Sequence, residues 1–330
     1  MSRRRRTLSL LLALSALSAT APLLGAQTRL VVVSGVSGEA RFATLFQQWA
    51  QSMIDAARTR YGVPDSAIVW LAEDPARAPG RIAGRSTKEA IGSTLAATAR
   101  RMGANERLLL LVIAHGTVGE SPRLALPGPD VTPEELARML APFGDRDVGV
   151  VLAASASGDF IPALSAPNRV VIAAAKGMEG NETRFPAHFV AAFAKEGADR
   201  DKDGRVSLLE AFAYAGAEVR REYDDDGKLL TEHALLDDDG DRAGSAPPGD
   251  TGTDGRLARR FVLEGGRAAA SGDPAVVALQ GQKRELERKV DALRARKAQM
   301  AAAAYEEALE SLLVELAGVN RQLREKGGTP

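Results

Sequence analysis

The sequence predicts a doubly wound, mostly parallel α/β sheet followed by a C-terminal helical hairpin or coiled coil. Short apolar runs alternate with longer amphipathic segments, which is typical of strands and helices that take turns along a parallel sheet. Near the C-terminus, leucines recur every seven residues, which is typical of packed helices. The strands are expected at Leu30–Val33, Ala67–Leu71, Leu108–Ala114, Val148–Ala154 and Arg169–Ala174.

The predicted helices follow from apolar periodicity and from capping residues. Thr132 with Glu135, Ser207 with Glu210, and Ser86 with Glu89 all have the spacing of a capping box. A short apolar stretch at Arg260–Leu263 predicts a strand that closes the sheet. The helices are expected at Ala40–Tyr61, Ser86–Met102, Thr132–Leu140, Glu182–Lys195 and Leu208–Tyr223.

Composition and the N-terminus exclude several classes of protein. Lys+Arg and Asp+Glu are both 43, and four of the arginines lie in residues 1–26, so no net basic charge favours nucleic acid. Residues 1–26 combine this arginine run with an apolar stretch, which predicts a signal peptide and therefore a periplasmic or secreted protein without a stable membrane span. The chain has no cysteine, which excludes disulfides and thiolate metal sites.

The C-terminal part has a different character from the rest. A linker of small residues is expected at 267–273, and heptad leucines then run through 274–326. The apolar positions before and after Met300 are out of phase, so one helix with a stutter and a helical hairpin both remain open. The hairpin is favoured because each half carries its own apolar stripe, and this segment is a candidate for self-association.

Two predicted strands end in polar motifs that carry a family resemblance. The strand before His115-Gly116 and the strand before Ser155-Ala156-Ser157-Gly158 should end at the same edge of the sheet, where open parallel sheets bind their ligands. With Leu126–Asp130, these motifs make residues 27–266 resemble the caspase/legumain-like cysteine peptidases. The resemblance makes His115 and Ser155 the dyad positions, with serine in place of the family's cysteine. It also implies a substrate pocket at Gly116, Ser157, Gly158 and Arg184.

The replacement of cysteine by serine decides the expected function. A hydroxyl needs direct contact with an oriented base, whereas a thiol ionises far more easily. We therefore expect an exported, catalytically inactive pseudo-peptidase that binds a peptide or protein. One alternative is an active hydrolase that uses a Ser155–His115 dyad, and another is an assembly protein that acts through its helical tail.

An acidic segment matches a twelve-residue, EF-hand-like calcium loop at 199–210. Carboxylates fall at loop positions 1, 3 and 5, glycine at 6, a backbone carbonyl at 7 and a glutamate at 12. The same residues also form a helix cap and a solvated turn, so calcium is an expectation with a structural alternative. The ligands would be Asp199, Asp201, Asp203, Arg205, Ser207 and Glu210.

Three smaller signals complete the sequence. Asp237, Asp239 and Asp241 share the 1-3-5 spacing, but Arg242 replaces the glycine, so they are interpreted as a loop with at most a weak cation site. His188 is expected to be partly buried in a helix. His233 is a candidate to face the cleft.

Overall fold

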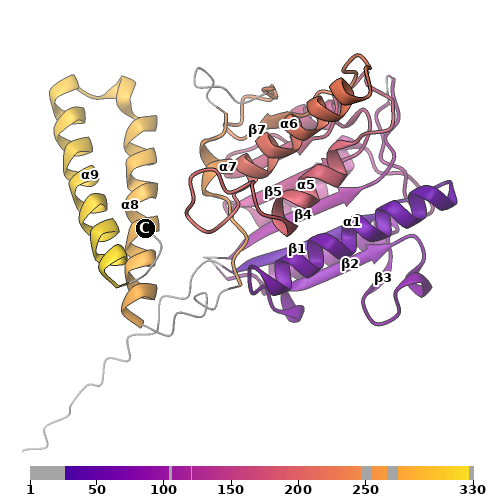
Figure 1. Cartoon of the computed structure of the whole chain (residues 1–330), viewed down its shortest axis with the longest axis horizontal. Helices are drawn as coiled ribbons and strands as arrows, with labels where there is room; N and C mark the ends of the chain where they lie inside the picture. The colour runs from indigo at the N-terminus through magenta and orange to yellow at the C-terminus, as the bar shows by residue number, and fades with distance from the viewer. Residues whose placement is uncertain (1–26, 104–105, 120, 247–253, 266–273, 327–330) are drawn as a thin grey trace, which may run out of the picture.

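A computed structural model describes residues 27–103, 106–119, 121–246, 254–265 and 274–326. A seven-stranded sheet in the order β3-β2-β1-β4-β5-β6-β7 forms its centre (Figure 1). The predicted signal peptide and the predicted linker at 267–273 lie outside the described residues. The strands are β1 Thr28–Ser34, β2 Ile68–Ala72, β3 Gly84–Arg85, β4 Arg107–Ile113, β5 Val148–Ala153, β6 Arg169–Ala173 and β7 Leu235–Asp237.

The sheet is parallel except at one edge. Strands β1 to β6 pair in parallel, whereas β7 runs antiparallel to β6 with Val171 opposite Asp237. The closing strand predicted at Arg260–Leu263 is wrong, because the short helix α7 (Arg256–Arg260) occupies its start and only Val262 forms an isolated bridge, to Ser207. Neither β3 nor β7 was predicted, because strands of two and three residues leave no readable apolar run.

Helices cover both faces of the sheet, as the doubly wound prediction requires. On the face seen in Figure 1 lie α1 (Ala40–Thr59), α5 (Phe185–Ala194) and α6 (Leu208–Asp225). Helix α1 is amphipathic: its buried side chains Phe42, Phe46, Ala50 and Met53 recur at three- and four-residue intervals. The opposite face carries α2 (Lys88–Arg101), α3 (Pro133–Leu140) and α4 (Ile161–Leu164).

Two of the three predicted capping boxes are confirmed. Thr132 with Glu135 caps α3, and Ser207 with Glu210 caps α6. At α2 the cap is Thr87, one residue later than predicted. The Ser86 hydroxyl instead donates to the Ser34 carbonyl at 2.7 Å, since Ser86 is buried against the end of β1.

The C-terminal segment reverses direction near Met300, as predicted. Helix α8 (Pro274–Ala295) and helix α9 (Ala302–Glu325) lie side by side (Figure 1). Val276 and Leu279 on α8 form a small apolar cluster with Leu323 on α9, separate from the two clusters of the sheet domain. Among the described helices, none has the length and apolar content needed to cross a membrane.

Candidate functional site

The two polar motifs meet at the carboxyl-terminal edge of the sheet. Strands β4 and β5 are neighbours with Ile113 opposite Ala153, so His115 and Ser155 follow the two strand ends side by side. Strand order reverses between β1 and β4, and ligands of open α/β sheets bind in the crevice at such a switch point. His115 and Ser155 therefore lie at the same edge of the sheet, as the sequence predicts.

Ser155 directs its hydroxyl to a neighbouring backbone. Its Oγ accepts from the Gly116 N–H and donates to the Gly116 carbonyl, both at 3.2 Å. The residue is 7% exposed. A Cβ at Gly116 would lie 1.9 Å from the Ser155 carbonyl oxygen, so only glycine permits this close approach of the two loops.

The His115 ring contacts the loop after β1 and the start of α1. Its Nε2 lies 3.1 Å from the Ser37 carbonyl oxygen, and its ring packs edge-on against Phe42 at 4.5 Å between centroids. Ser37 is itself held by Glu73, whose Oε2 accepts from both the Ser37 N–H and its hydroxyl. Among the described contacts, no hydrogen bond joins His115 to Ser155.

The turn after Ser155 is tightly constrained. Ala156 adopts the left-handed conformation (φ 51°, ψ 22°), which is costly for a residue with a side chain. Ser157 is fully buried; its hydroxyl donates to the Ala154 carbonyl and accepts from the Ala174 N–H. A Cβ at Gly158 would lie 3.0 Å from the Ala175 carbonyl oxygen. Ser157 and Gly158, predicted as pocket residues, therefore hold the turn in place.

Arg184, the remaining predicted pocket residue, pairs with acidic groups of the chain itself. Its guanidinium lies 2.6 Å from Asp226 and 3.5 Å from Glu222, and it stacks over the Tyr223 ring. The side chain of His188 contacts the same Glu222 at 2.8 Å and is 22% exposed, in agreement with the prediction of a partly buried histidine. The positive charge of Arg184 is thus balanced by Glu222 and Asp226 at the end of α6.

Two glutamates that were not predicted have structural contacts near the site, Glu179 at the Ser155 turn and Glu232 at the start of α5. Glu179 binds the His233 Nδ1 at 2.6 Å and the His233 N–H, while its carbonyl accepts from Ala156. Glu232 is buried and accepts from the N–H groups of Arg184 and Phe185 at the start of α5. Burial raises the pKa of Glu232 to about 7, although these two N–H groups oppose the shift. Neither glutamate belongs to a spaced motif that would have revealed it.

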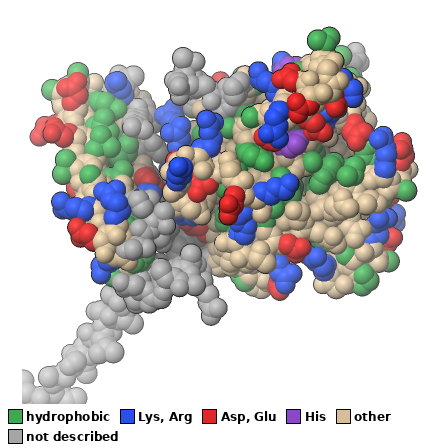
Figure 2. All heavy atoms as spheres, in the orientation of Figure 1, with side chains coloured by type: hydrophobic (Ala, Val, Ile, Leu, Met, Phe, Trp, Pro, Cys, Tyr) green, Lys and Arg blue, Asp and Glu red, His purple; other side chains and the backbone are tan. Residues whose placement is uncertain are grey.

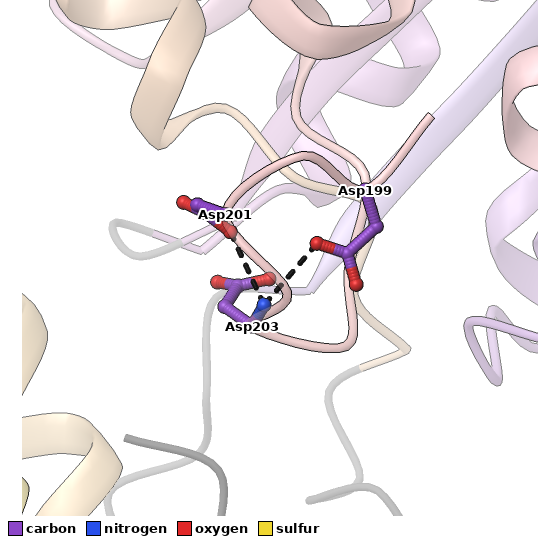
Figure 3. A group of neighbouring side chains, drawn as sticks. All are labelled: Asp199, Asp201 and Asp203. Atoms are coloured by element: carbon purple, nitrogen blue, oxygen red, sulfur yellow. Dashed lines mark hydrogen bonds between the residues drawn. The ribbon is translucent and has the colours of Figure 1, made fainter. Parts of the chain in front are cut away.

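The acidic loop forms the geometry that its motif predicts at several positions. Carboxylate oxygens of Asp199, Asp201 and Asp203 gather within 4.8 Å of one another (Figure 3). Gly204 has φ +85°, and its N–H donates to Asp199 at 2.9 Å. The Glu210 carboxylate lies at the loop entrance, where Oε1 accepts from the Arg200 and Asp201 N–H groups.

The remaining two predicted ligands have further contacts within the chain. The Arg205 guanidinium pairs with Glu264 at 2.5 Å and approaches Asp203 at 3.4 Å, which leaves its backbone carbonyl as the predicted ligand. Ser207 is buried and bridges to Val262. Burial, followed by the neighbouring Asp203 and Glu210 carboxylates, raises the pKa of Asp201.

Comparisons with known proteins find similarity to solved structures alone. No protein-family model matches the chain, and no curated protein matches it. Among solved structures, the chain is similar to the crystal structure of caspase-1 from Spodoptera frugiperda, with 12% sequence identity and a TM-score of 0.42. That match covers 66% of this chain and 90% of the caspase chain.

Proposed function

We propose that this chain is an exported, caspase/legumain-like pseudo-peptidase that binds a peptide or protein at the sheet edge bearing His115 and Ser155. The observation that carries the proposal is that each dyad position is hydrogen-bonded to backbone groups and, among the described contacts, not to the other. The Ser155 hydroxyl is engaged with the Gly116 backbone, and the His115 ring with the Ser37 carbonyl. A serine nucleophile needs a base in hydrogen-bond contact, and that base needs an orienting partner.

Burial of the turn supports a binding role over catalysis. Ser155 is 7% exposed and its hydroxyl is hydrogen-bonded to both the N–H and the carbonyl of Gly116, so attack on a substrate carbonyl would require these bonds to break. The Glu179–His233 pair and the exposed residues of the 117–119 segment lie around this turn and offer polar contacts to a bound chain. We infer that the ligand contacts the rim of the site and leaves the dyad positions covered.

Reactive probes test the absence of catalysis. A serine-reactive phosphonate should leave the purified chain unlabelled, and fluorogenic peptides should not be cleaved. Because the chain has no cysteine, Ser155→Cys introduces a single thiol. It should react with a thiol-directed peptide electrophile faster than Ser157→Cys, a matched control in the same turn whose serine is fully buried. Cleavage by the unaltered chain that is lost in both Ser155→Ala and His115→Ala would establish the active-hydrolase alternative.

We further propose that the 199–210 loop binds calcium. Support comes from the gathered carboxylates of Asp199, Asp201 and Asp203 and from the positive φ of Gly204 at the sixth position. Calcium bound here would tie the loop before α6 to the Phe261–Val262 segment, since Leu208 N–H donates to the Phe261 carbonyl and Ser207 bridges to Val262. The role of the ion would be structural, as it lies on the loop and not at the dyad positions.

Assembly through the helical tail is retained as a second candidate function. Val314 is 66% exposed and Leu313 is 43% exposed on α9. Figure 2 shows apolar side chains gathered along the hairpin. Sedimentation of the full chain beside a Leu313→Glu/Val314→Glu variant tests this candidate, because a tail-mediated oligomer should dissociate in the variant.

A further inference from the structure

Three carboxylates from two separate segments meet at the β7 edge of the sheet. Asp237 ends β7, Asp239 follows it in the next turn, and Asp254 precedes α7. One oxygen from each of the three lies within 4.8 Å of the others. The linear spacing of Asp237, Asp239 and Asp241 does not describe this group, because Asp254 takes the third place.

Burial makes this cluster different from an exposed acidic turn. Asp237 is 1% exposed and Asp254 is 7% exposed, whereas Asp239 is exposed. Asp237 Oδ1 accepts from the Gly240 N–H at 3.2 Å, and the Ser165 hydroxyl lies near the same carboxylate. The buried Oδ2 nevertheless has no hydrogen-bond partner within 3.5 Å. A buried carboxylate oxygen without a partner is costly, so this atom points to a ligand that supplies positive charge or a donor.

The neighbouring Asp238 shows what a purely structural carboxylate does in this position. Its Oδ1 accepts from the Gly255 N–H at 2.8 Å and its Oδ2 from the Ala258 N–H at 2.7 Å, so both oxygens cap α7. Asp254 accepts from the Asp238 N–H and from the Ser245 hydroxyl. For Asp237, Asp239 and Asp254, no ion pair to a lysine or arginine is found within the described part of the chain.

The geometry points to a second divalent-cation site, with Asp237, Asp239 and Asp254 as its protein ligands and calcium as its ion. The donor set is entirely oxygen, which hard cations prefer. Calcium accepts oxygen ligands at about 2.3–2.6 Å in flexible geometry, whereas magnesium requires a near-ideal octahedron at about 2.0–2.1 Å. Three ligands from two segments of unequal burial suit the less demanding ion.

Such an ion would connect three parts of the fold. Asp237 belongs to the edge strand β7, Asp239 to the turn after it, and Asp254 to the start of α7 (Figure 1). The outer side of β7 is already bridged by Ser245, whose backbone exchanges two hydrogen bonds with Leu236. The ion would therefore add a link between the end of β7 and the segment before α7. This inference is independent of the 199–210 loop and of the proposed binding function.

Calcium titration of the purified full chain, after treatment with chelator, tests the site. The measurements are made in the Glu210→Ala background, so that binding at the 199–210 loop is weakened and failure of that proposal is scored separately. Asp239→Asn should weaken the remaining calcium binding by at least about tenfold. Because Asp239 is exposed, the melting temperature of the Asp239→Asn variant in chelator should match that of the parent chain. Asp237→Asn should weaken binding similarly.

Asp241→Asn is the matched control, as Asp241 is an exposed aspartate two residues from Asp239 and outside the cluster. It should leave the calcium affinity within about twofold of the parent. Absence of calcium binding in the Glu210→Ala background at millimolar calcium would overturn the proposal. Equal loss of affinity in Asp241→Asn and Asp239→Asn would also overturn it, since the ligands would then be the linear 1-3-5 set.

Discussion

At the scale of single residues, two backbone features fix the surroundings of Ser155. Gly116 approaches Ser155 so closely that its N–H and carbonyl both bind the serine hydroxyl. Ala156 holds the turn in a left-handed conformation, which costs of order 1–3 kcal/mol and is maintained by contacts such as Ala156 N–H to Glu179. The Ser155 side chain therefore stabilises the contact between the two loops.

Glu232 should make stability depend on pH. Burial raises its folded-state pKa from 4.5 to about 7, so the folded protein binds this proton more tightly than the unfolded chain. The contribution is fully present below about pH 4.5 and is lost as the pH rises through about 7. Relative to Glu232→Gln, the free energy of unfolding should fall by about 3 kcal/mol over this interval. Urea denaturation at several pH values measures the difference.

The comparison with Glu232→Gln cancels the titration of the other acidic groups. Glu134→Gln, an exposed glutamate in the first turn of α3, serves as a control for removing a carboxylate. A difference between the parent chain and Glu232→Gln that stays constant from pH 4.5 to pH 7.5 would contradict the prediction. Glu232→Gln should also be less stable than the parent at low pH. The Arg184 and Phe185 N–H groups bind different oxygens of Glu232, and in glutamine one of these oxygens is replaced by an NH2 group that cannot accept.

At the scale of elements, one short segment has two structural roles. Ser207 and Glu210 form the capping box of α6, and the same glutamate closes the 199–210 loop by accepting from the N–H groups of Arg200 and Asp201. Loop and helix are consequently stabilised by one carboxylate. Loss of the cap and loss of a calcium ligand must be separated experimentally.

Calcium should raise the melting temperature through this loop. One saturated site contributes about 3–4 kcal/mol at a large excess of calcium over its dissociation constant. In the Asp239→Asn background, where the second proposed site is weakened, Glu210→Ala should abolish the remaining shift because the bidentate ligand is lost. Differential scanning calorimetry with calcium and with chelator measures it.

Ser207→Ala is the control for the helix cap. It should lower stability by about 1 kcal/mol in chelator, as expected for loss of an N-cap, while most of the calcium-induced shift remains. If Ser207→Ala and Glu210→Ala lost the shift equally, or if calcium left the Asp239→Asn chain unchanged, the loop would be a solvated turn with a helix cap.

At the scale of the whole molecule, the chain has separate apolar cores. Two clusters cover the two faces of the sheet, and a third lies between α8 and α9. Glu287 on α8 lies within electrostatic reach of Arg205 and Arg260 of the sheet domain; burial raises its pKa, and these cations oppose the shift. Arg205 and Arg260 thus influence Glu287 electrostatically, while an apolar cluster of the hairpin holds α8 to α9.

Leu323→Ala should unfold the hairpin without unfolding the sheet domain. Leu323 is fully buried, and truncating such a leucine costs about 2–5 kcal/mol. Both tryptophans, Trp49 and Trp70, lie in the sheet domain, so their fluorescence reports on that domain alone. Far-UV circular dichroism should show an early loss of helix in the variant, while the fluorescence midpoint stays unchanged.

Val314→Ala is the control on the same helix, because Val314 is largely exposed. Its circular dichroism transition should match that of the parent chain. A fluorescence midpoint that falls together with the helical signal in Leu323→Ala would mean that hairpin and sheet domain unfold as one unit.

The sequence by itself determined the alternation of strands and helices and the sheet edge at which His115 and Ser155 lie. Buried parallel strands require continuous apolar side chains, so β1, β2, β4, β5 and β6 were readable, and with them the common edge of His115 and Ser155. The caps of α3 and α6 were readable for a similar reason, since capping is a contact between residues three apart.

Only the tertiary structure decided which atoms meet at that edge and at β7. The Ser155 hydroxyl binds Gly116, and the His115 ring binds the Ser37 carbonyl. Nothing in the sequence distinguishes this pattern from a direct contact between Ser155 and His115. Asp254 joins Asp237 and Asp239 across an intervening loop, and the three-residue strand β7 forms because β6 offers a free edge. Local spacing specifies contacts within a helix or strand, whereas these contacts depend on how distant segments pack, which spacing does not encode.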